Sequence, residues 1–289
     1  MMENALEVRG LRKEYKGFRL KDVSFTVPSG TIMGLVGANG AGKTTIIKII
    51  MNLVRREAGE VLVFGMDNLA AEKAVKTRIG FVPETPGLIE DIRLRDIKAA
   101  VARFYPKWDE TAFVRLAGEF GLPLAKKLKK LSHGTRMKFS LALALSHDAD
   151  LLVLDEPTSG LDPVFRRELL ERLSGVIQDE GKAVLFSTHI TTDLEPTADH
   201  ITLLSRGEVV FSLPKDEIRE TWALVRGGPE LRNGTGRALF RGVRESAYGT
   251  EALTSDIPAV KAAFPSGVAI EKASIEDIMV FMDRGSAHA

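Results

Sequence analysis

Hydrophobic and polar residues alternate near the start of the chain, and longer apolar runs follow further on. Alternation with a period of two predicts strands that are buried on one face, and it occurs at residues 6–8, 23–27 and 60–64. Runs that are almost entirely apolar are typical of strands buried on both faces of a parallel sheet, and they occur at residues 32–36, 183–186 and, apart from Asp150, 149–154. The chain therefore predicts an α/β domain that begins with a β-rich part.

A helical period from about residue 91 to residue 146 predicts helices inserted between these groups of strands. After residue 213 the pattern changes to turn signals and to short strand candidates at residues 238–240 and 268–270. Ser274 and Asp277 have the spacing of a capping box, which predicts a last helix through Met282.

These changes of pattern divide the chain into two parts. We predict one domain over residues 1–214, with a helical insertion at about residues 88–146, and a small α+β extension over residues 215–289. The extension either adds buried surface to the edge of the domain or has a regulatory or dimerising role. The sequence leaves both alternatives open.

One segment meets every fixed position of the phosphate-binding loop pattern G-x-x-x-x-G-K-[ST]. Its residues are Gly37, Ala38, Asn39, Gly40, Ala41, Gly42, Lys43 and Thr44. The glycines let backbone N–H groups turn toward the α- and β-phosphates of a nucleotide. The Lys43 ammonium can reach the β- and γ-phosphates, and the Thr44 hydroxyl can bind Mg²⁺. The sequence therefore predicts a site for a nucleoside triphosphate.

Two carboxylates follow the apolar run at residues 149–154. The carboxyl ends of the strands in an open parallel sheet are where functional groups meet a ligand. Asp155 is suited to hold Mg²⁺ through water, and Glu156 is placed to orient or deprotonate the attacking water. His189 follows the next apolar strand and would lie at the same edge of the sheet, although a lone histidine there is more often structural.

A further candidate anion site precedes the helical segment at residues 137–145. Ser132 and Gly134 offer a hydroxyl and backbone N–H groups at a helix start. Taken alone, this segment is better explained by an N-cap serine followed by a flexible glycine.

Over roughly residues 6–213 the order of these features resembles that of the ATP-binding subunits of ABC transporters. Residues 131–135 look like the signature motif of that family, residues 159–162 like its D-loop, and His189 like its switch histidine. Tyr15 looks like the aromatic residue that stacks on adenine, and Phe18 is the alternative. The resemblance implies a P-loop NTPase fold of ABC type, with a mostly parallel core sheet, an antiparallel β subdomain and a helical insertion.

The resemblance also implies how ATP is bound and hydrolysed. Two ATPase subunits, either two copies of this chain or this chain and a paralogue, would meet head to tail. ATP would lie between residues 37–45 of one subunit, Thr45 included, and Ser132 and Gly134 of the other. Asp162 would also bind the nucleotide. Glu156, His189 and Lys43 would be the catalytic residues. Thr44, Asp155 and Glu84 would hold Mg²⁺.

Two positions depart from the family pattern. Glu84 stands where the family usually has glutamine, and it can still approach Mg²⁺ as an anionic oxygen ligand. The signature reads Leu-Ser-His-Gly-Thr instead of Leu-Ser-Gly-Gly-Gln, so that His133 adds bulk and a titratable group and Thr135 has a shorter polar side chain. With the aromatic residues at 104–108 and the extension, these departures resemble ATPases of bacterial drug, bacteriocin or hydrophobic-peptide exporters.

By this resemblance the protein hydrolyses ATP to power a separate membrane permease, for export of a drug-like, lipid or peptide substrate. One alternative is a soluble ABC-type ATPase that acts on translation or DNA, but the chain has one phosphate loop and no room for a long coiled coil between Lys43 and Ser132. Another alternative is a small-molecule phosphoryl transferase. That class would leave residues 131–135 and His189 without a joint role.

Composition adds limits on partners and location. The formal net charge of +1 gives no general sign of a nucleic-acid partner, and we expect none. The absence of cysteine excludes disulfides and thiolate metal sites and agrees with a cytoplasmic location. No apolar run approaches the roughly 18 residues of a membrane span, and the first residues lack a signal-peptide pattern. We therefore expect a cytoplasmic protein that is peripheral on the inner face of the membrane.

Overall fold

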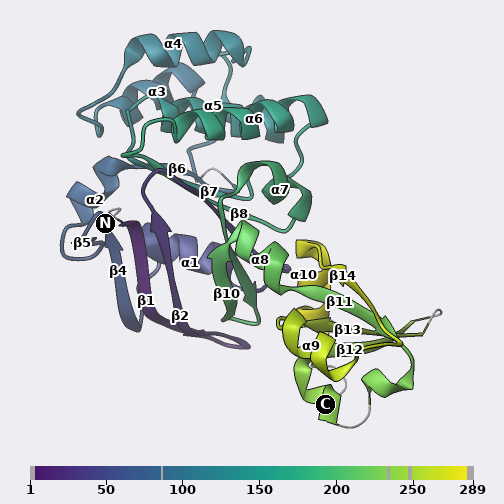
Figure 1. Cartoon of the computed structure of the whole chain (residues 1–289). Helices are drawn as coiled ribbons and strands as arrows, with labels where there is room; N and C mark the ends of the chain where they lie inside the picture. Colours follow the sequence, from purple (N-terminus) through teal and green to yellow (C-terminus); the bar gives the residue numbers. More distant parts are fainter. Residues whose placement is uncertain (1–3, 86, 233–234, 247–248, 285–289) are drawn as a thin grey trace.

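The computed structural model of this chain describes residues 4–85, 87–232, 235–246 and 249–284. Its central sheet has six strands in the order β10-β9-β3-β8-β7-β6, and all neighbours are parallel except β9 and β10 (Figure 1). The strands are β3 (Ile32–Val36), β6 (Ile79–Val82), β7 (Leu151–Asp155), β8 (Ala183–Thr188), β9 (His200–Ser205) and β10 (Glu208–Pro214). The predicted mostly parallel core sheet is therefore confirmed.

A second sheet, antiparallel, has the strand order β2-β1-β4-β5. Its strands are β1 (Asn4–Tyr15), β2 (Phe18–Pro28), β4 (Ala58–Val63) and β5 (Met66–Asp67). The strand predicted at residues 60–64 ends at Val63, because Phe64 has a φ of 46° and turns the chain into β5 together with Gly65. This sheet is the antiparallel β subdomain that the sequence predicted.

Helices cover the central sheet and link its strands. They are α1 (Lys43–Ile50), α2 (Glu72–Arg78), α3 (Leu94–Ala102), α4 (Glu110–Glu119), α5 (His133–Leu145), α6 (Pro163–Val176) and α7 (Leu194–Thr197). Short 3₁₀ helices lie at Leu128–Lys130 and Thr191–Asp193. Helices α3, α4 and α5 follow β6 and form the layer at the top of Figure 1, which agrees with the helical period of the sequence.

The apolar strands of the central sheet are buried on both faces, as their composition predicted. Leu152 and Leu154 of β7 belong to a core shared with the helices α4, α5 and α6. Leu151 and Val153 of the same strand belong to a core shared with α1 and the antiparallel sheet. Successive side chains of a strand point to opposite faces, so one short apolar run contributes to two cores.

The extension forms a third sheet, antiparallel, in the order β12-β13-β11-β14. Its elements are α8 (Lys215–Thr221), β11 (Ala223–Gly227), β12 (Phe240–Ser246), β13 (Gly249–Thr254), α9 (Ile257–Ala263), β14 (Ala269–Lys272) and α10 (Ile275–Arg284), with 3₁₀ helices at Pro229–Leu231 and Thr235–Leu239. The strand predicted at residues 268–270 corresponds to β14, which begins one residue later and continues to Lys272.

The strand predicted at residues 238–240 was wrong for its first two residues, which belong to a 3₁₀ helix. The physical reason is pairing: β12 begins at Phe240, whose partner Thr254 is the last residue of β13. Among the described residues, no strand pairs with the segment before Phe240, and the Thr254 hydroxyl donates to the Leu239 carbonyl instead.

The last helix begins at the predicted capping box. The Asp277 N–H donates to the Ser274 hydroxyl oxygen, and the Ser274 N–H donates to the Asp277 carboxylate, at 3.1 and 3.0 Å. The helix α10 continues beyond Met282 to Arg284.

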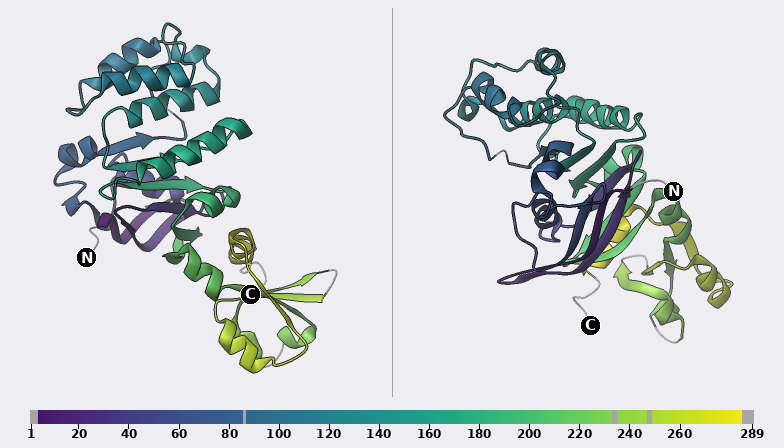
Figure 2. Two further views of the ribbon diagram at one scale, coloured as in Figure 1. Left: turned by 45° about the horizontal axis from the view of Figure 1, so that its top comes forward. Right: turned by 90° about the vertical axis from the view of Figure 1, so that its left-hand side faces the viewer.

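The helical layer and the extension lie at opposite ends of the molecule, with the two other sheets between them (Figures 1 and 2). Helix α10 packs against both β9 of the central sheet and β12 of the extension. Within the described part of the chain, no helix is long and apolar enough to cross a membrane.

Candidate active site

The phosphate-binding loop lies between the end of β3 and the start of α1. Gly40 and Gly42 have φ angles of 81° and 115°, a region of backbone conformation that favours glycine. Gly37 meets a different limit: a Cβ atom at this position would lie 2.4 Å from the Leu204 carbonyl oxygen of β9. The glycines of the motif are therefore required by backbone conformation and by close packing.

Lys43 is the first residue of α1, and its side chain is buried. Its ammonium donates to the Gly37 carbonyl at 2.7 Å and to the Ala38 carbonyl at 3.4 Å. The same nitrogen lies 3.2 Å from Oε1 of Glu156. The lysine is thus folded back over the loop, with a carboxylate as its counter-ion.

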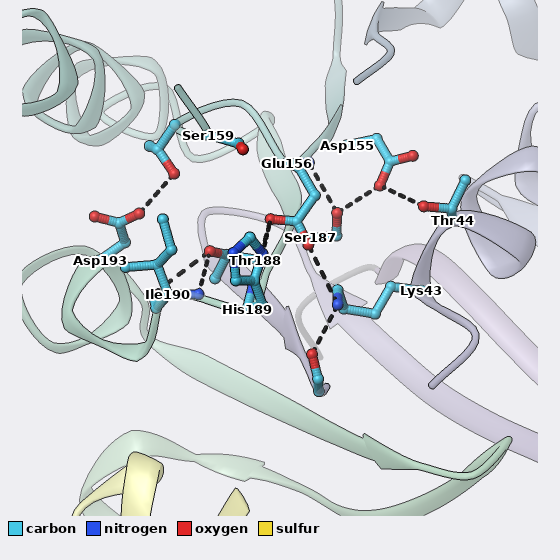
Figure 3. Close-up of polar contacts among 12 residues, drawn as sticks. Lys43, Thr44, Asp155, Glu156, Ser159, Ser187, Thr188, His189, Ile190 and Asp193 are labelled. Carbon is cyan, nitrogen blue, oxygen red and sulfur yellow. Dashed lines mark hydrogen bonds and ion pairs between the residues drawn. The ribbon is translucent and has the colours of Figure 1, made fainter. Parts of the chain in front are cut away.

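Asp155 ends β7, and two hydroxyl groups hold one of its oxygens (Figure 3). Ser187 of the neighbouring strand β8 donates to Oδ1 of Asp155 at 2.6 Å, and Thr44 donates to the same oxygen at 3.2 Å. The Ser187 oxygen also accepts from the N–H of Glu156 at 3.0 Å. Two of the three predicted Mg²⁺ ligands, Thr44 at the start of α1 and Asp155 at the end of β7, therefore lie within hydrogen-bond distance of each other.

Ser187 is a residue to which sequence reasoning assigned no role. The available signal was its type and place: a hydroxyl residue near the end of β8, a strand whose preceding residues are all apolar and buried. A buried hydroxyl needs hydrogen-bond partners, and here both partners belong to the carboxylate pair.

Glu156 and His189 come from different strand ends and meet in the site. Nδ1 of His189 lies 2.8 Å from Oε2 of Glu156, and the His189 N–H donates to the same oxygen at 3.3 Å. Figure 3 shows the Glu156 carboxylate between Lys43 and His189. Glu156 has a φ of 48°, rare for a residue with a side chain, and such strain is found at functional sites.

The segment after Glu156 is anchored through Asp193. Thr158 donates to one oxygen of the Asp193 carboxylate at 2.7 Å, and the Arg166 guanidinium donates to the other at 2.6 Å. Asp162 accepts from the Phe165 N–H at 2.9 Å and so caps α6. Its predicted contact with a nucleotide stays a prediction beside this capping role.

Ser132 and Gly134 lie at the start of α5, as the sequence predicted for a helix N-cap. The Ser132 hydroxyl accepts from the Thr135 N–H at 3.3 Å, and the His133 ring lies 3.2 Å from the Ser159 carbonyl. Among the residues that the structure describes, no hydrogen bond or ion pair joins Ser132 or Gly134 to the phosphate loop. A joint role of the two segments in one ATP site stays a prediction.

The two candidates for the adenine contact face each other across the hairpin of β1 and β2. The Tyr15 ring is exposed, with the Lys13 ammonium 5.4 Å from its centre. The Phe18 ring lies against the phosphate loop: a Cβ atom added to Gly42 would lie 2.9 Å from it. The contact of Tyr15 with adenine stays a prediction. The contact of Thr45 with the nucleotide also stays a prediction.

Glu84 follows β6 and lines a cavity of about 500 Å³ together with Thr44 and Asp155. The cavity continues under the helical layer to Tyr105 and His147, whose rings stack with centres 3.7 Å apart. His147 is buried, and among the residues that the structure describes its Nδ1 has no hydrogen-bond partner. Burial lowers the pKa of this imidazole to about 4. Burial also raises the pKa of the Tyr105 hydroxyl.

A glycine-rich loop before a helix, a buried lysine and two carboxylates at a strand end define the site of a P-loop ATPase. The ABC transporter family model matches residues 20–159 of this chain. ABC transporter ATP-binding protein YtrB of Bacillus subtilis (strain 168) is 30% identical over 222 residues, which are 76% of this chain and 76% of that protein.

Nod factor export ATP-binding protein I of Rhizobium johnstonii (strain DSM 114642 / LMG 32736 / 3841) is 32% identical over 213 residues, 71% of this chain and 68% of that protein. A solved structure of an ATP-binding subunit of an ABC transporter is 31% identical with a TM-score of 0.68, and the match covers 75% of this chain and 92% of that one.

The chain therefore belongs to the ATP-binding proteins of ABC transporters. It is an ATP-binding and ATP-hydrolysing subunit of a transport system, which confirms the predicted class of enzyme. The relatives do not support the alternative of an ATPase that acts on translation or DNA.

Proposed function

We propose that this chain pairs head to tail with a second ATPase subunit, closes on ATP and Mg²⁺, and drives a membrane permease that exports a drug-like, lipid or peptide substrate. The observation that carries the proposal is the Glu156 carboxylate between Lys43 and His189. Export is supported by the likeness to a Nod factor export ATP-binding protein. Location at the inner face of the membrane would follow from docking on the permease.

Each residue of this cluster has a task that follows from its contacts. Lys43 is preorganised by two loop carbonyls and needs only to exchange its counter-ion for phosphate oxygens. Glu156 is the base that orients and deprotonates the attacking water. His189 holds the second oxygen of Glu156 and would contact the γ-phosphate.

Magnesium fits the donors at the site. Thr44, Asp155 and Glu84 supply hard oxygen donors, which Mg²⁺ prefers, and they line one cavity. Within the described ranges, no three or more His, Cys, Asp or Glu side chains gather as they would around a metal ion held by such side chains alone. This agrees with Mg²⁺, which commonly takes one or two carboxylates and completes its ligands with water and substrate phosphates. Bound there, Mg²⁺ would neutralise charge on the β- and γ-phosphates.

A second subunit would supply the parts of the site that one chain leaves apart. Ser132 and Gly134 lie at the N-terminus of the 13-residue helix α5, a helix end that favours anions. In a head-to-tail pair they would bind the γ-phosphate held by the phosphate loop of the other subunit.

The cavity next to Glu84 is the proposed docking site of the permease. It lies between the phosphate-loop helix and the helical layer, and residues such as Leu88, Val101 and Leu143 make much of its lining apolar. Ile89, next to Leu88 in the chain, is a large apolar residue that is exposed to solvent. Because the chain has no cysteine, Ile89→Cys can be cross-linked selectively to the co-expressed permease, with Glu60→Cys on β4 as the control.

The pairing is tested by the mass of purified Glu156→Gln protein in solution, measured by light scattering with and without ATP and Mg²⁺. We expect a reversible doubling with ATP. Ser132→Asp in the same background keeps an N-cap acceptor but places a negative charge against the phosphate, so it should prevent the doubling. A monomer that binds ATP without pairing would contradict a homodimer.

A further inference from the structure

The turn between β9 and β10 contacts parts of the molecule that are far apart in sequence. It consists of Arg206 and Gly207, whose φ angles of 50° and 79° are both positive. A two-residue hairpin of this kind matches the natural twist of its strands. The turn lies between the phosphate loop, the β1–β2 hairpin and the end of helix α10.

On one side the turn holds the phosphate loop. The Gly207 N–H donates to the Ala41 carbonyl at 3.1 Å. Because a trans peptide is planar, its carbonyl and its N–H point in opposite directions. The bond to Gly207 therefore directs the N–H of Gly42 away from the turn, and Gly42 is a residue of the phosphate-binding motif.

Gly207 itself is closely confined. Its carbonyl accepts from the Lys21 N–H at 2.8 Å, and a Cβ atom on it would lie 1.9 Å from the Arg19 carbonyl oxygen. The turn can therefore hold the phosphate loop in a defined position.

On the other side the turn is held by the last residues of α10. The Ser205 hydroxyl donates to the Met282 carbonyl at 3.3 Å, and the Arg206 guanidinium donates to the Asp283 carbonyl. The last carbonyls of a helix lack partners within the helix and carry partial negative charge, so they suit a cation such as Arg206.

Helix α10 is itself firmly packed. Ile278 and Phe281 are buried in a core that also contains Phe211 of β10 and Trp222 next to β11. The end of the helix therefore has a defined position relative to the central sheet.

We infer that the C-terminal extension positions the phosphate loop, through the end of α10, Arg206 and Gly207, and so sets the affinity of the site for nucleotide. Arg206 is a positioning residue, since its contacts lie with α10 and it acts on the loop only through its neighbour Gly207. This inference rests on the proposed assignment of residues 37–44 to the phosphates.

Arg206→Ala in the full chain tests the inference, because Arg206 is exposed and its loss leaves no cavity in the core. Binding of ADP with Mg²⁺ is measured by calorimetry, which avoids turnover. Loss of a cation from a helix end predicts an affinity lower by about two- to fivefold. Arg206→Lys should recover most of the affinity. Arg241→Ala, which removes an exposed arginine of β12 that bonds Ser255, is the matched control and should bind like wild type.

Steady-state kinetics and hydrogen exchange separate positioning from general loosening. The KM for ATP should rise in Arg206→Ala with kcat nearly unchanged, because the lost contact acts on binding. By reciprocity, nucleotide should slow amide exchange in residues 275–284 of the wild type, and less so in Arg206→Ala.

Two results would overturn the inference: an ADP affinity of Arg206→Ala equal to that of wild type, or an equal loss in Arg241→Ala. Failure of the wild-type chain to bind ADP would instead refute the assignment of residues 37–44.

Discussion

Replacement of Glu156 by glutamine removes the negative charge between Lys43 and His189 and keeps the shape of the side chain. In this structure the charge lies 3.2 Å from the Lys43 ammonium, and both side chains are buried. The substitution therefore changes two quantities, the rate of hydrolysis and the affinity for nucleotide.

The effect on the rate follows from the role of a general base. Loss of a positioned base typically lowers turnover by about 10²- to 10⁴-fold. We expect Glu156→Gln to fall in this range, because the His189 contact and the loop contacts of Lys43 remain available.

The effect on affinity follows from the ion pair. At 3.2 Å and an effective dielectric constant of about 20, the gross attraction between the two charges is about 5 kcal/mol. Much of this attraction is offset by the cost of taking both charges out of water. Removal of one partner is nevertheless costly, by about 3 to 5 kcal/mol, because it leaves a buried cation without a counter-ion. Phosphate oxygens would neutralise that cation, so binding should tighten by about tenfold or more, or about 1.4 kcal/mol.

The assay combines single-turnover hydrolysis with calorimetric binding of a non-hydrolysable ATP analogue, for wild type and Glu156→Gln. Glu180→Gln, at an exposed position after α6, is the control and should change neither quantity. Turnover within tenfold of wild type would refute Glu156 as the base. Unchanged affinity would refute the argument that Glu156 is the counter-ion of Lys43 until nucleotide arrives.

Two further predictions concern Ser187 and His147. Ser187→Ala removes the hydroxyl between Asp155 and the Glu156 N–H, so the Mg²⁺ concentration for half-maximal ATPase activity should rise about tenfold; an unchanged Mg²⁺ titration would contradict this. The pKa of His147 is about 4 in the folded protein against 6.5 in the unfolded chain, so stability is present above pH 6.5 and is lost as the pH falls toward 4. The free energy of unfolding, measured in urea at pH 6.5 and pH 4, should fall by about 3 kcal/mol less in His147→Phe than in wild type. An equal fall in both proteins would contradict this.

Several parts of the fold could be predicted because their signals are local. The capping box of Ser274 and Asp277 closes within one turn of helix, and both of its bonds form. The apolar composition of β7 and β8 reports burial on both faces without any knowledge of their neighbours. The strand expected at residues 238–240 was wrong for its first two residues, because the start of β12 depends on where β13 ends and not on a local signal.

The site could be predicted only as far as each residue carries its own chemistry. Glycines before Lys43 and carboxylates after an apolar strand have recognisable patterns. A single serine does not, so Ser187 was missed although it contacts both Asp155 and Glu156. Gly207 was missed because the carbonyl that it holds belongs to a loop 166 residues earlier in the chain (207 − 41).

The sequence by itself determined that this protein has a phosphate-binding loop, two carboxylates at the end of a buried strand and a helical segment between them. Only the tertiary structure decided which of these groups meet. Thr44 and Asp155 are 111 residues apart and Ser205 and Met282 are 77 apart, yet each pair shares a hydrogen bond. The physical reason is that residue type determines what a side chain can do, whereas strand order and packing determine what lies within about 3 Å of it.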